Sequence, residues 1–510
     1  MTDRSDGIKG IDLLIVGGGA AGSTLAGIVA RDTDLRVVLL EAGPDYGPHS
    51  AGGWPAEMLD ARRFGLTHDW GYSGLMQPDH ETPRKFERGR ILGGSSSHNG
   101  CIVRLGHRHD YDHWAELGNA GWDWESVKPA FDRAVKAMRV RQPDRSEATP
   151  FQAGIIDSAV ASGIPEVHDL NDPDAVSGVG LAPVNIQDGI RWNAAFAYLD
   201  PVRERPNLQI IGNALVDSIE IELGRAVAVQ AVIDGLRMRI PAGRIVLAGG
   251  AYGSPAMLLR SGIGDPDELA PVGIQPVHAL PGVGKRLTDH ATVSLQFWGK
   301  EALDRAMDEF EATRWLPDEQ ALAKTRSSRC SEAFDLHVYS LSRRDAESGR
   351  WFYHIAAATM TPRSHGALKL TSADPEATLS VDHGYLNDPE GYDLAVLTDG
   401  LEIVQQIVAQ SPLAELLDVE RRAGTSHVAK ADATAFIRRY VGIDYHPACS
   451  CRMGPSSDPE AVVDATGKVH GLDGLYVCDA SIFPTLMRAN TNLPAVMVAE
   501  HLARAIGEMG

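Results

Sequence analysis

The amino-acid sequence predicts a two-domain α/β protein, in which a doubly wound, mostly parallel sheet opens the chain and a domain of α+β character is interleaved with it. Three observations favour this fold class. A strand-like run, a glycine-rich turn, a small-residue helix and a second strand-like run follow one another between residues 11 and 40. Strand-like and helix-like segments continue well past residue 200, and the segment from about 300 to 430 combines charged helices with strand-like runs. With 510 residues, of which 44% are hydrophobic, the chain can bury a large core and is long enough for two or more domains.

The first expected element is a buried strand over Ile11 to Val16, because this short apolar run ends at glycines. Small residues predict a helix over Ala20 to Ala30, and a second apolar run predicts a strand over Arg36 to Leu40. This strand-turn-helix-strand order is typical of the first unit of a doubly wound nucleotide-binding domain. The other expected elements are strands over Leu208 to Ile211, Leu215 to Glu222, Arg244 to Ala248, Leu336 to Ser340 and Ala367 to Leu370, and helices over Ser254 to Arg260, Ala302 to Phe310 and Leu394 to Ala409.

Charge and cysteine usage exclude several classes of partner. Lys and Arg number 48 against 68 Asp and Glu, a net charge of −20, and no basic run is interleaved with aromatic residues, so we expect binding neither to nucleic acid nor to an anionic membrane. Five scattered cysteines are too few for a disulfide framework in a chain of this length, which indicates a reducing cytoplasm. The one long apolar stretch, Ile11 to Ala30, is interrupted by the glycines of the turn, so we expect no membrane-spanning segment.

The first motif is the glycine turn Gly17-Gly18-Gly19-Ala20-Ala21-Gly22 between the first strand and the first helix. Glycines at these positions allow a tight turn and let the backbone approach a pyrophosphate at the helix N-terminus. Glu41 follows Gly22 by 19 residues, at the end of the second strand, where a carboxylate can accept hydrogen bonds from ribose hydroxyls. The context favours a dinucleotide site over a plain glycine-rich turn. Because the chain carries one such fingerprint, we expect one dinucleotide and an electron acceptor other than NAD.

The second motif is the segment Gly89-Arg90-Ile91-Leu92-Gly93-Gly94-Ser95-Ser96-Ser97-His98-Asn99-Gly100. It is too rich in glycine and serine for a core element, and it offers many backbone and hydroxyl donors. Such a loop suits the binding of phosphate or of a flavin edge. Its composition alone is equally typical of a surface loop.

The third motif is His446-Pro447-Ala448-Cys449-Ser450-Cys451, followed 44 residues after the histidine by Asn490-Thr491-Asn492. Imidazole titrates near neutral pH, so His446 can take a proton from an alcohol as hydride leaves carbon, and Asn490 can orient the same hydroxyl. Taken alone, a histidine before proline is more often structural. The histidine and cysteine spacing matches no common zinc pattern, so we expect no metal.

Together the three motifs resemble those of the glucose-methanol-choline (GMC) oxidoreductases, over nearly the whole chain. Further segments are similar to those of the same family, namely residues 68–72, 189–198, 248–264 and 281–290 and the C-terminal helix after Pro494. The resemblance implies a discontinuous, Rossmann-like FAD-binding domain of residues 1–155, 200–295 and 436–510. It also implies a substrate domain built on an antiparallel sheet, of residues 156–199 and 296–435, with the active site between the domains.

The resemblance assigns a role to each site residue. His446 and Asn490 take the two catalytic positions. The residues implied to bind FAD are Gly17, Gly19, Ala20, Ala21, Gly22, Glu41 and Ala42 at the ADP half, Trp70, Arg90, Gly93, Gly94, Ser95, His98, Asn99 and Gly100 at the diphosphate and flavin, Val216 at the adenine, and Asp479, Ala480, Thr491 and Asn492 at the ribityl chain and pyrimidine edge.

Within the family, the loop around His98 is similar to that of choline oxidases, which implies a covalent bond between His98 and the flavin. The alternative is a histidine that packs beside the flavin. Three departures from the family pattern are Cys449 with Ser450, Gly100, and Asp444 two residues before the expected base. A carboxylate at residue 444 can bind a cationic substrate, favour the protonated form of His446, alter oxygen access at the flavin, or face the surface.

The resemblance implies that a primary or secondary alcohol is oxidised to an aldehyde or ketone by hydride transfer to flavin N5, with O₂ or another acceptor taking the electrons. Alternatives are a lyase of the hydroxynitrile lyase or photodecarboxylase type, a dehydrogenase of aromatic or sugar alcohols, and a flavin-binding protein without catalysis. The family also implies a homodimer. The sequence leaves the substrate open among choline-like, aromatic, furanic and sugar alcohols.

Overall fold

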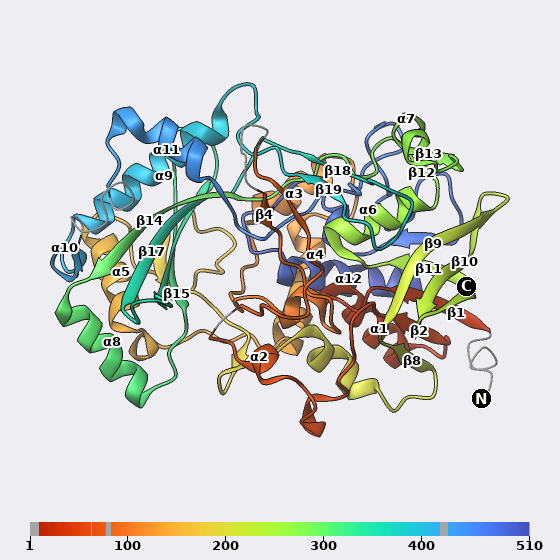
Figure 1. The fold of residues 1–510 in the computed structure, drawn as a ribbon, viewed down its shortest axis with the longest axis horizontal. Coiled ribbons are helices and arrows are strands. Elements are labelled where there is room, and N and C mark those ends of the chain that lie inside the picture. The colour runs from red at the N-terminus through yellow and green to blue at the C-terminus, as the bar shows by residue number, and fades with distance from the viewer. Residues whose placement is uncertain (1–9, 63, 78–82, 419–426, 509–510) are drawn as a thin grey trace.

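The computed structural model describes residues 10–62, 64–77, 83–418 and 427–508, and two large sheets dominate its architecture. In Figure 1 the sheet that contains β1 lies at the right of the molecule and the sheet that contains β14 at the left. The chain passes between them several times, so each sheet is built from segments far apart in the sequence.

The first sheet has the strand order β8-β2-β1-β11-β10-β9, and β22 also pairs with β11. The pairs of β8 with β2, β2 with β1, β1 with β11 and β11 with β22 are parallel, whereas β9, β10 and the first half of β11 form an antiparallel meander. The predicted α/β architecture with a parallel sheet is therefore confirmed. The strands are β1 (Ile11–Val16), β2 (Val37–Leu40), β8 (Leu208–Ile211), β9 (Ala214–Glu222), β10 (Arg225–Ile233), β11 (Leu236–Leu247) and β22 (Leu475–Val477).

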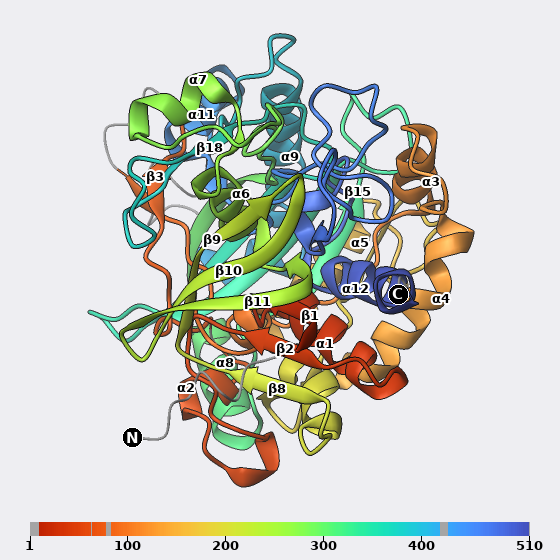
Figure 2. The ribbon, with the colours of Figure 1, turned by 90° about the vertical axis from the view of Figure 1, so that its right-hand side faces the viewer.

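Helices cover the parallel strands, which explains why β1 and β2 are almost wholly apolar and buried. Helix α1 (Ala20–Asp32) packs against α12 (Asn492–Glu508), and α12 packs against α4 (Trp124–Ala137). Figure 2 shows α12 beside α1, next to β1. Helix α6 (Gly250–Arg260) follows β11 through a glycine pair, just as α1 follows β1. Both helices thus begin at the carboxyl ends of neighbouring parallel strands, where ligands bind in sheets of this kind.

The second sheet has the strand order β20-β14-β17-β16-β15-β5, with β21 also pairing with β14, and all of its pairs are antiparallel. Helices α5, α8, α9 and α11 pack against this sheet, so the expected antiparallel sheet of a second domain is confirmed. The elements are β5 (Gly178–Leu181), β14 (Ala291–Gly299), β15 (Glu319–Thr325), β16 (Leu336–Arg344), β17 (Trp351–Thr359), β20 (Leu417–Asp418), β21 (Gly442–Ile443), α5 (Pro150–Ala161), α8 (Glu301–Thr313), α9 (Tyr392–Val408) and α11 (Ala433–Tyr440).

Two expected strands differ in extent or partner. The strand expected over Arg244 to Ala248 is the end of the longer β11, whose first half forms a hairpin with β10. The strand expected over Ala367 to Leu370 forms β18 (Ala367–Lys369), which belongs to a small third sheet. The other strands of that sheet are β19 (Ser380–Asp382), β3 (Ser73–Leu75) and β4 (Arg84–Lys85). The residue boundaries of the domain segments stay a prediction.

Candidate active site

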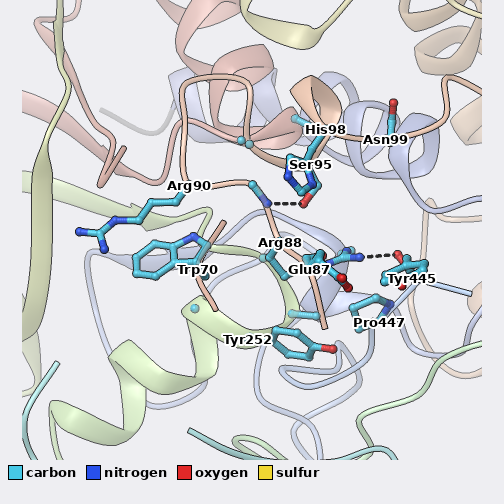
Figure 3. A pocket seen from close by; sticks show the side chains of 18 of the residues that line it. Trp70, Glu87, Arg88, Arg90, Ser95, His98, Asn99, Tyr252, Tyr445 and Pro447 are labelled. Atoms are coloured by element: carbon cyan, nitrogen blue, oxygen red, sulfur yellow. Dashed lines mark hydrogen bonds between the residues drawn. The ribbon is translucent and has the colours of Figure 1, made fainter. Parts of the chain in front are cut away.

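A cavity of about 720 Å³ lies between the two large sheets and is lined by residues from all three motifs. Figure 3 shows part of its lining, with Trp70 and Arg90 at one side and Tyr445 and Pro447 at the other. The expected site residues that line it are Gly17, Gly19, Ala20, Ala21, Glu41, Ala42, Trp70, Arg90, Gly94, Ser95, His98, Asn99, Gly100, Val216, His446, Asp479, Ala480, Asn490, Thr491 and Asn492.

The glycine turn brings the N-terminus of α1 to the cavity. Gly17 has a φ of +103°, and a Cβ there would lie 2.4 Å from the carbonyl oxygen of Ala248. A Cβ on Gly22 would lie 1.9 Å from the carbonyl oxygen of Gly17, so Gly22 lets the helix pack directly on the turn and does not itself line the cavity. Gly19 is the N-cap of α1, and no side chain caps the helix. Its first N–H groups are therefore available to an anion such as a diphosphate.

Glu41 places a buried carboxyl group beside this helix end. Its Oε2 accepts a hydrogen bond from Gly18 N at 2.7 Å, and its Oε1 accepts one from Gly43 N at 2.8 Å. Burial raises the pKa of Glu41 to about 7, although both hydrogen bonds favour the ionised form. Each oxygen keeps an acceptor position free for a hydroxyl donor, so Glu41 and the helix end together fit the ribose and diphosphate of FAD.

The loop over residues 89–100 packs on the glycine turn. Gly93 has a φ of +87° and donates its N–H to the carbonyl of Gly18 at 2.7 Å, so it supports the loop and is not part of the cavity lining. The Arg90 guanidinium lies over the Trp70 ring, 4.8 Å from the ring centroid. These contacts hold the loop as one wall of the cavity, as Figure 3 shows around Arg90 and Trp70.

His98 lies in the same wall, near Ser95 (Figure 3). The side chain is 6% exposed, and its Nε2 lies 3.1 Å from the carbonyl oxygen of Thr67, which requires a proton on this nitrogen. Burial lowers the pKa of His98. Burial thus favours the neutral imidazole, in which the proton on Nε2 leaves Nδ1 unprotonated.

The two expected catalytic side chains meet at the cavity. Asn490 Nδ2 lies 3.1 Å from His446 Nε2. On the other side of the ring, His446 Nδ1 lies 3.0 Å from His290 Nδ1 and 3.2 Å from Asp444 Oδ2. The backbone N–H of His446 donates to Asp289 Oδ1 at 2.9 Å. A half-buried imidazole with one nitrogen at the cavity and the other hydrogen-bonded behind it is suited to accept a proton from a bound molecule.

His290 and Asp289 had no assigned role in the sequence, although they end a segment that resembles the family. His290 is fully buried, and its Nε2 lies 3.1 Å from the carbonyl oxygen of Met487. Burial, followed by the nearby His446, lowers the pKa of His290 to about 3. Burial raises the pKa of Asp289 to about 7. The sequence gave no signal for the contact between His290 and His446, because 156 residues separate them along the chain.

The second sheet supplies the opposite wall, through Glu319 and Leu322 of β15 and His337, Tyr339 and Leu341 of β16. The Tyr339 hydroxyl donates to Asp444 Oδ1 at 2.7 Å. Burial, followed by repulsion from Asp444, raises the pKa of Glu319 to about 8. All five lie in the range from Phe297 to Arg343, where the sequence led us to expect substrate-lining side chains, but the individual residues were not predicted because alternation along a strand does not tell which face meets a cavity.

Among the described residues, one group of histidines and carboxylates has the spacing of a metal site, namely His290, Asp444 and His446. The same atoms are joined by the hydrogen bonds of the preceding network, so shared protons account for their closeness. Cys449 and Cys451, considered with His446 in the sequence, do not belong to this group. Within the described ranges, no helix is both long and apolar enough to cross a membrane.

Comparison with known proteins places these features in a family. Two models of the GMC oxidoreductase family match residues 11–292 and 362–499. The chain is 32% identical over 534 residues to an oxygen-dependent choline dehydrogenase 1 of Chromohalobacter salexigens, which covers 96% of this chain and 94% of the relative. It is 33% identical over 543 residues to the mitochondrial choline dehydrogenase of Homo sapiens, and the match covers 97% of this chain and 89% of the human protein.

Solved structures agree with this assignment. The crystal structure of pyridoxine 4-oxidase from Mesorbium loti superposes with a TM-score of 0.86 and 28% identity, covering 97% of this chain and 99% of that one. A formate oxidase structure superposes with a TM-score of 0.83 at 21% identity, covering 97% and 98%, and shows the common fold. The chain belongs to the GMC oxidoreductase family and is an FAD-dependent oxidoreductase that acts on the CH–OH group of its donor.

Proposed function

We propose that His446 is the base that accepts the hydroxyl proton of a primary or secondary alcohol and that Asn490 orients that hydroxyl. The observation that carries the proposal is the pair of His446 Nε2 and Asn490 Nδ2, 3.1 Å apart at the cavity wall. Asn490 Oδ1 is buried and has no hydrogen-bond partner among the described residues. An alcohol hydroxyl that replaces this direct hydrogen bond donates to Nε2 and accepts from Nδ2, so the pair fits one alcohol group.

The chain's own residues then perform three tasks. His446 takes the hydroxyl proton at Nε2 while the C–H bond of the alcohol breaks, and the Asn490 amide N–H stabilises the developing alkoxide. The uncapped N-terminus of α1, Glu41 and the loop over residues 89–100 hold FAD. When bound, FAD supplies the hydride acceptor.

His446→Ala tests the base assignment. Removing a general base lowers the rate of the step it assists by about 10² to 10⁴-fold, so flavin reduction measured by anaerobic stopped-flow absorbance should slow by that factor. The matched control is His113→Ala, which removes a half-buried histidine of helix α3 (Arg108–Glu116) that does not line the cavity. Equal flavin reduction in both variants would refute the assignment. Product formed by the parent enzyme without bleaching of the flavin would favour the lyase alternative.

Choline is the first alcohol to test, because the chain is 32–33% identical to choline dehydrogenases over nearly its whole length. Pyridoxine follows, because a pyridoxine 4-oxidase, 28% identical to this chain, is one of its structural neighbours. Benzyl alcohol, 5-hydroxymethylfurfural and glucose complete the panel as neutral aromatic, furanic and sugar alcohols. Oxygen consumption, measured with and without an artificial dye acceptor, tells an oxidase from a dehydrogenase.

Assembly and location complete the proposed function. We propose a homodimer, which light scattering on the FAD-loaded protein tests by its mass relative to the 54.8 kDa chain. We also propose a cytoplasmic location on the basis of cysteine usage, while the human and mouse relatives are named as mitochondrial proteins. Fractionation of the source cells distinguishes these locations.

A further inference from the structure

We propose that Asp444 and His290 are positioning residues, which hold His446 in the tautomer with its proton on Nδ1 and its lone pair on Nε2. Asp444 additionally supplies the negative charge that stabilises the imidazolium formed at His446. The inference rests on the proposed role of His446 as the base, and it explains the residue at position 444 that departs from the family pattern.

His290 fixes the direction of the network. Its Nε2 faces the carbonyl oxygen of Met487 at 3.1 Å, and a carbonyl can only accept, so this nitrogen carries a proton. The ring is fully buried, and burial lowers its pKa to about 3, so it stays neutral. A neutral imidazole carries one proton, which leaves His290 Nδ1 with a lone pair facing His446.

His446 Nδ1 therefore faces two acceptors, the lone pair of His290 Nδ1 at 3.0 Å and Asp444 Oδ2 at 3.2 Å. Both contacts are satisfied only when His446 Nδ1 carries the proton. Neutral His446 then has its lone pair on Nε2, the nitrogen that receives the Asn490 N–H. Whenever the His446 ring is neutral, the network therefore orients its basic nitrogen, Nε2, toward the cavity.

Asp444 is held as a carboxylate. Its Oδ1 accepts from the Tyr339 hydroxyl at 2.7 Å while its Oδ2 faces His446. Burial acts to raise the pKa of Asp444, but attraction to His446 and the hydrogen bonds outweigh burial and lower it. A proton gained at His446 Nε2 places a cation 3.2 Å from this negative charge, which is the arrangement that stabilises imidazolium.

The backbone brings residues 444 and 446 to the same side of the chain. Tyr445, between them, has a φ of +62°, a conformation that non-glycine residues seldom adopt. Arg88 stabilises this conformation, because its Nη2 donates to the Tyr445 carbonyl at 3.0 Å, as Figure 3 shows. The carboxyl group of Asp289 accepts a hydrogen bond from the backbone N–H of the next residue, His446. The other titratable groups that interact with Asp444 or His446 are Asp289, His290, Glu319, His337, Tyr339 and Tyr385, and Glu87, Arg88 and Tyr445 line the cavity beside them.

The first test needs no substrate. In the FAD-loaded protein labelled with ¹⁵N-histidine, two-bond ¹H–¹⁵N spectra report the tautomer of each ring, and loss of signals in His446→Asn assigns His446. We expect neutral His446 to carry its proton on Nδ1, and we expect His290 to stay neutral with its proton on Nε2 from pH 6 to 9. Asp444→Asn should move His446 toward the Nε2-protonated form. Glu319→Gln removes the other cavity carboxyl of this wall, which contacts neither nitrogen, and should leave the His446 tautomer unchanged.

The second test is the pH dependence of flavin reduction with choline and with benzyl alcohol. Asp444→Asn should lower the limiting rate by about 10²-fold, no more than the loss of the base itself, and move the acidic limb of the profile to lower pH because the imidazolium loses its partner. Asp444→Glu, which keeps the charge, should recover most of the rate with unchanged FAD content. Loss of rate without a shift of the profile or the tautomer would overturn the proposal.

Two further outcomes separate this inference from its rivals. A higher KM for choline alone, with the limiting rate and tautomer of the parent, would overturn it and assign Asp444 to the binding of a cationic substrate. If His446→Ala reduces flavin as fast as the parent, the proposed base is wrong. The positioning network nevertheless stands if the spectra of the parent show the expected tautomer of His446. A wild-type His446 protonated on Nε2 would overturn the network itself.

Discussion

Gly22→Ala should both destabilise the protein and weaken FAD binding. The new Cβ would lie 1.9 Å from the carbonyl oxygen of Gly17, whereas ordinary contact begins at 3.4 Å, so the helix and the turn must separate by about 1.5 Å. Overpacking of this kind costs about 1–3 kcal/mol, and alanine in a helix returns about 0.5–1 kcal/mol, so the net loss is about 0–2.5 kcal/mol, and the severity of this overlap places it in the upper part of that range. A shift of this size also takes the first N–H groups of α1 out of hydrogen-bond range of a diphosphate.

The matched control is Gly507→Ala, in helix α12. A Cβ at Gly507 would lie 3.6 Å from Thr33 Cγ2, an ordinary contact, and the site is remote from the cavity. Urea unfolding of the FAD-free proteins and fluorescence titration with FAD measure both effects. Gly22→Ala should lower the unfolding midpoint and weaken FAD binding by at least about 10-fold, equal to about 1.4 kcal/mol, whereas Gly507→Ala should leave binding unchanged. Equal stability and equal affinity in the two variants would refute the packing argument for the turn.

Other predictions concern single side chains of the cavity. Burial raises the pKa of Glu41 from 4.5 to about 7, so ionisation of Glu41 opposes folding. The stability of the FAD-free parent should therefore fall as the pH rises from 4.5 to about 7, and this fall should be absent in Glu41→Gln. Ribose hydroxyls donate to the ionised form, so FAD affinity should rise over the same pH range in the parent and stay flat in Glu41→Gln, as titration at several pH values will show. A covalent bond to His98 should keep flavin in the acid-precipitated pellet of the parent and release it in His98→Ala, while flavin released from both would leave His98 as a packing residue. Asn490→Ala should slow flavin reduction at unchanged FAD content, and an unchanged rate would remove Asn490 from the site.

The sequence predicted best the elements whose signal is local. Strand β1 begins and ends where the apolar run predicts, because the run is buried on both faces and glycines end it. Only the last part of β11 was predicted, since its first half, from Leu236, is mostly exposed apart from Ile240 and lies in a hairpin that the apolar pattern does not reveal. The glycine turn was likewise predicted from residue types at fixed spacing, whereas the pairing of His446 with Asn490 was implied by the family resemblance and their catalytic roles stay a prediction.

Contacts between distant segments were not readable. The neighbours of His446 Nδ1 are His290, 156 residues away, and Asp444, for which the sequence left four roles open. One of those roles conflicts with the observed geometry. A carboxylate that lines the cavity and bonds both Tyr339 and His446 does not face the surface.

One wall of the cavity depends on the backbone of its residues, and the other depends on their side chains. The cofactor wall depends on the backbone, since Gly17 and Gly22 leave no room for a Cβ, and such positions tolerate few substitutions. The opposite wall depends on side chains that project from β15 and β16, such as Leu322 and Leu341, and these can change without altering the strands. A chain that is about one third identical to choline dehydrogenases can therefore keep the cofactor wall while its alcohol differs. We consequently expect the side chains of this second wall to decide the choice of substrate.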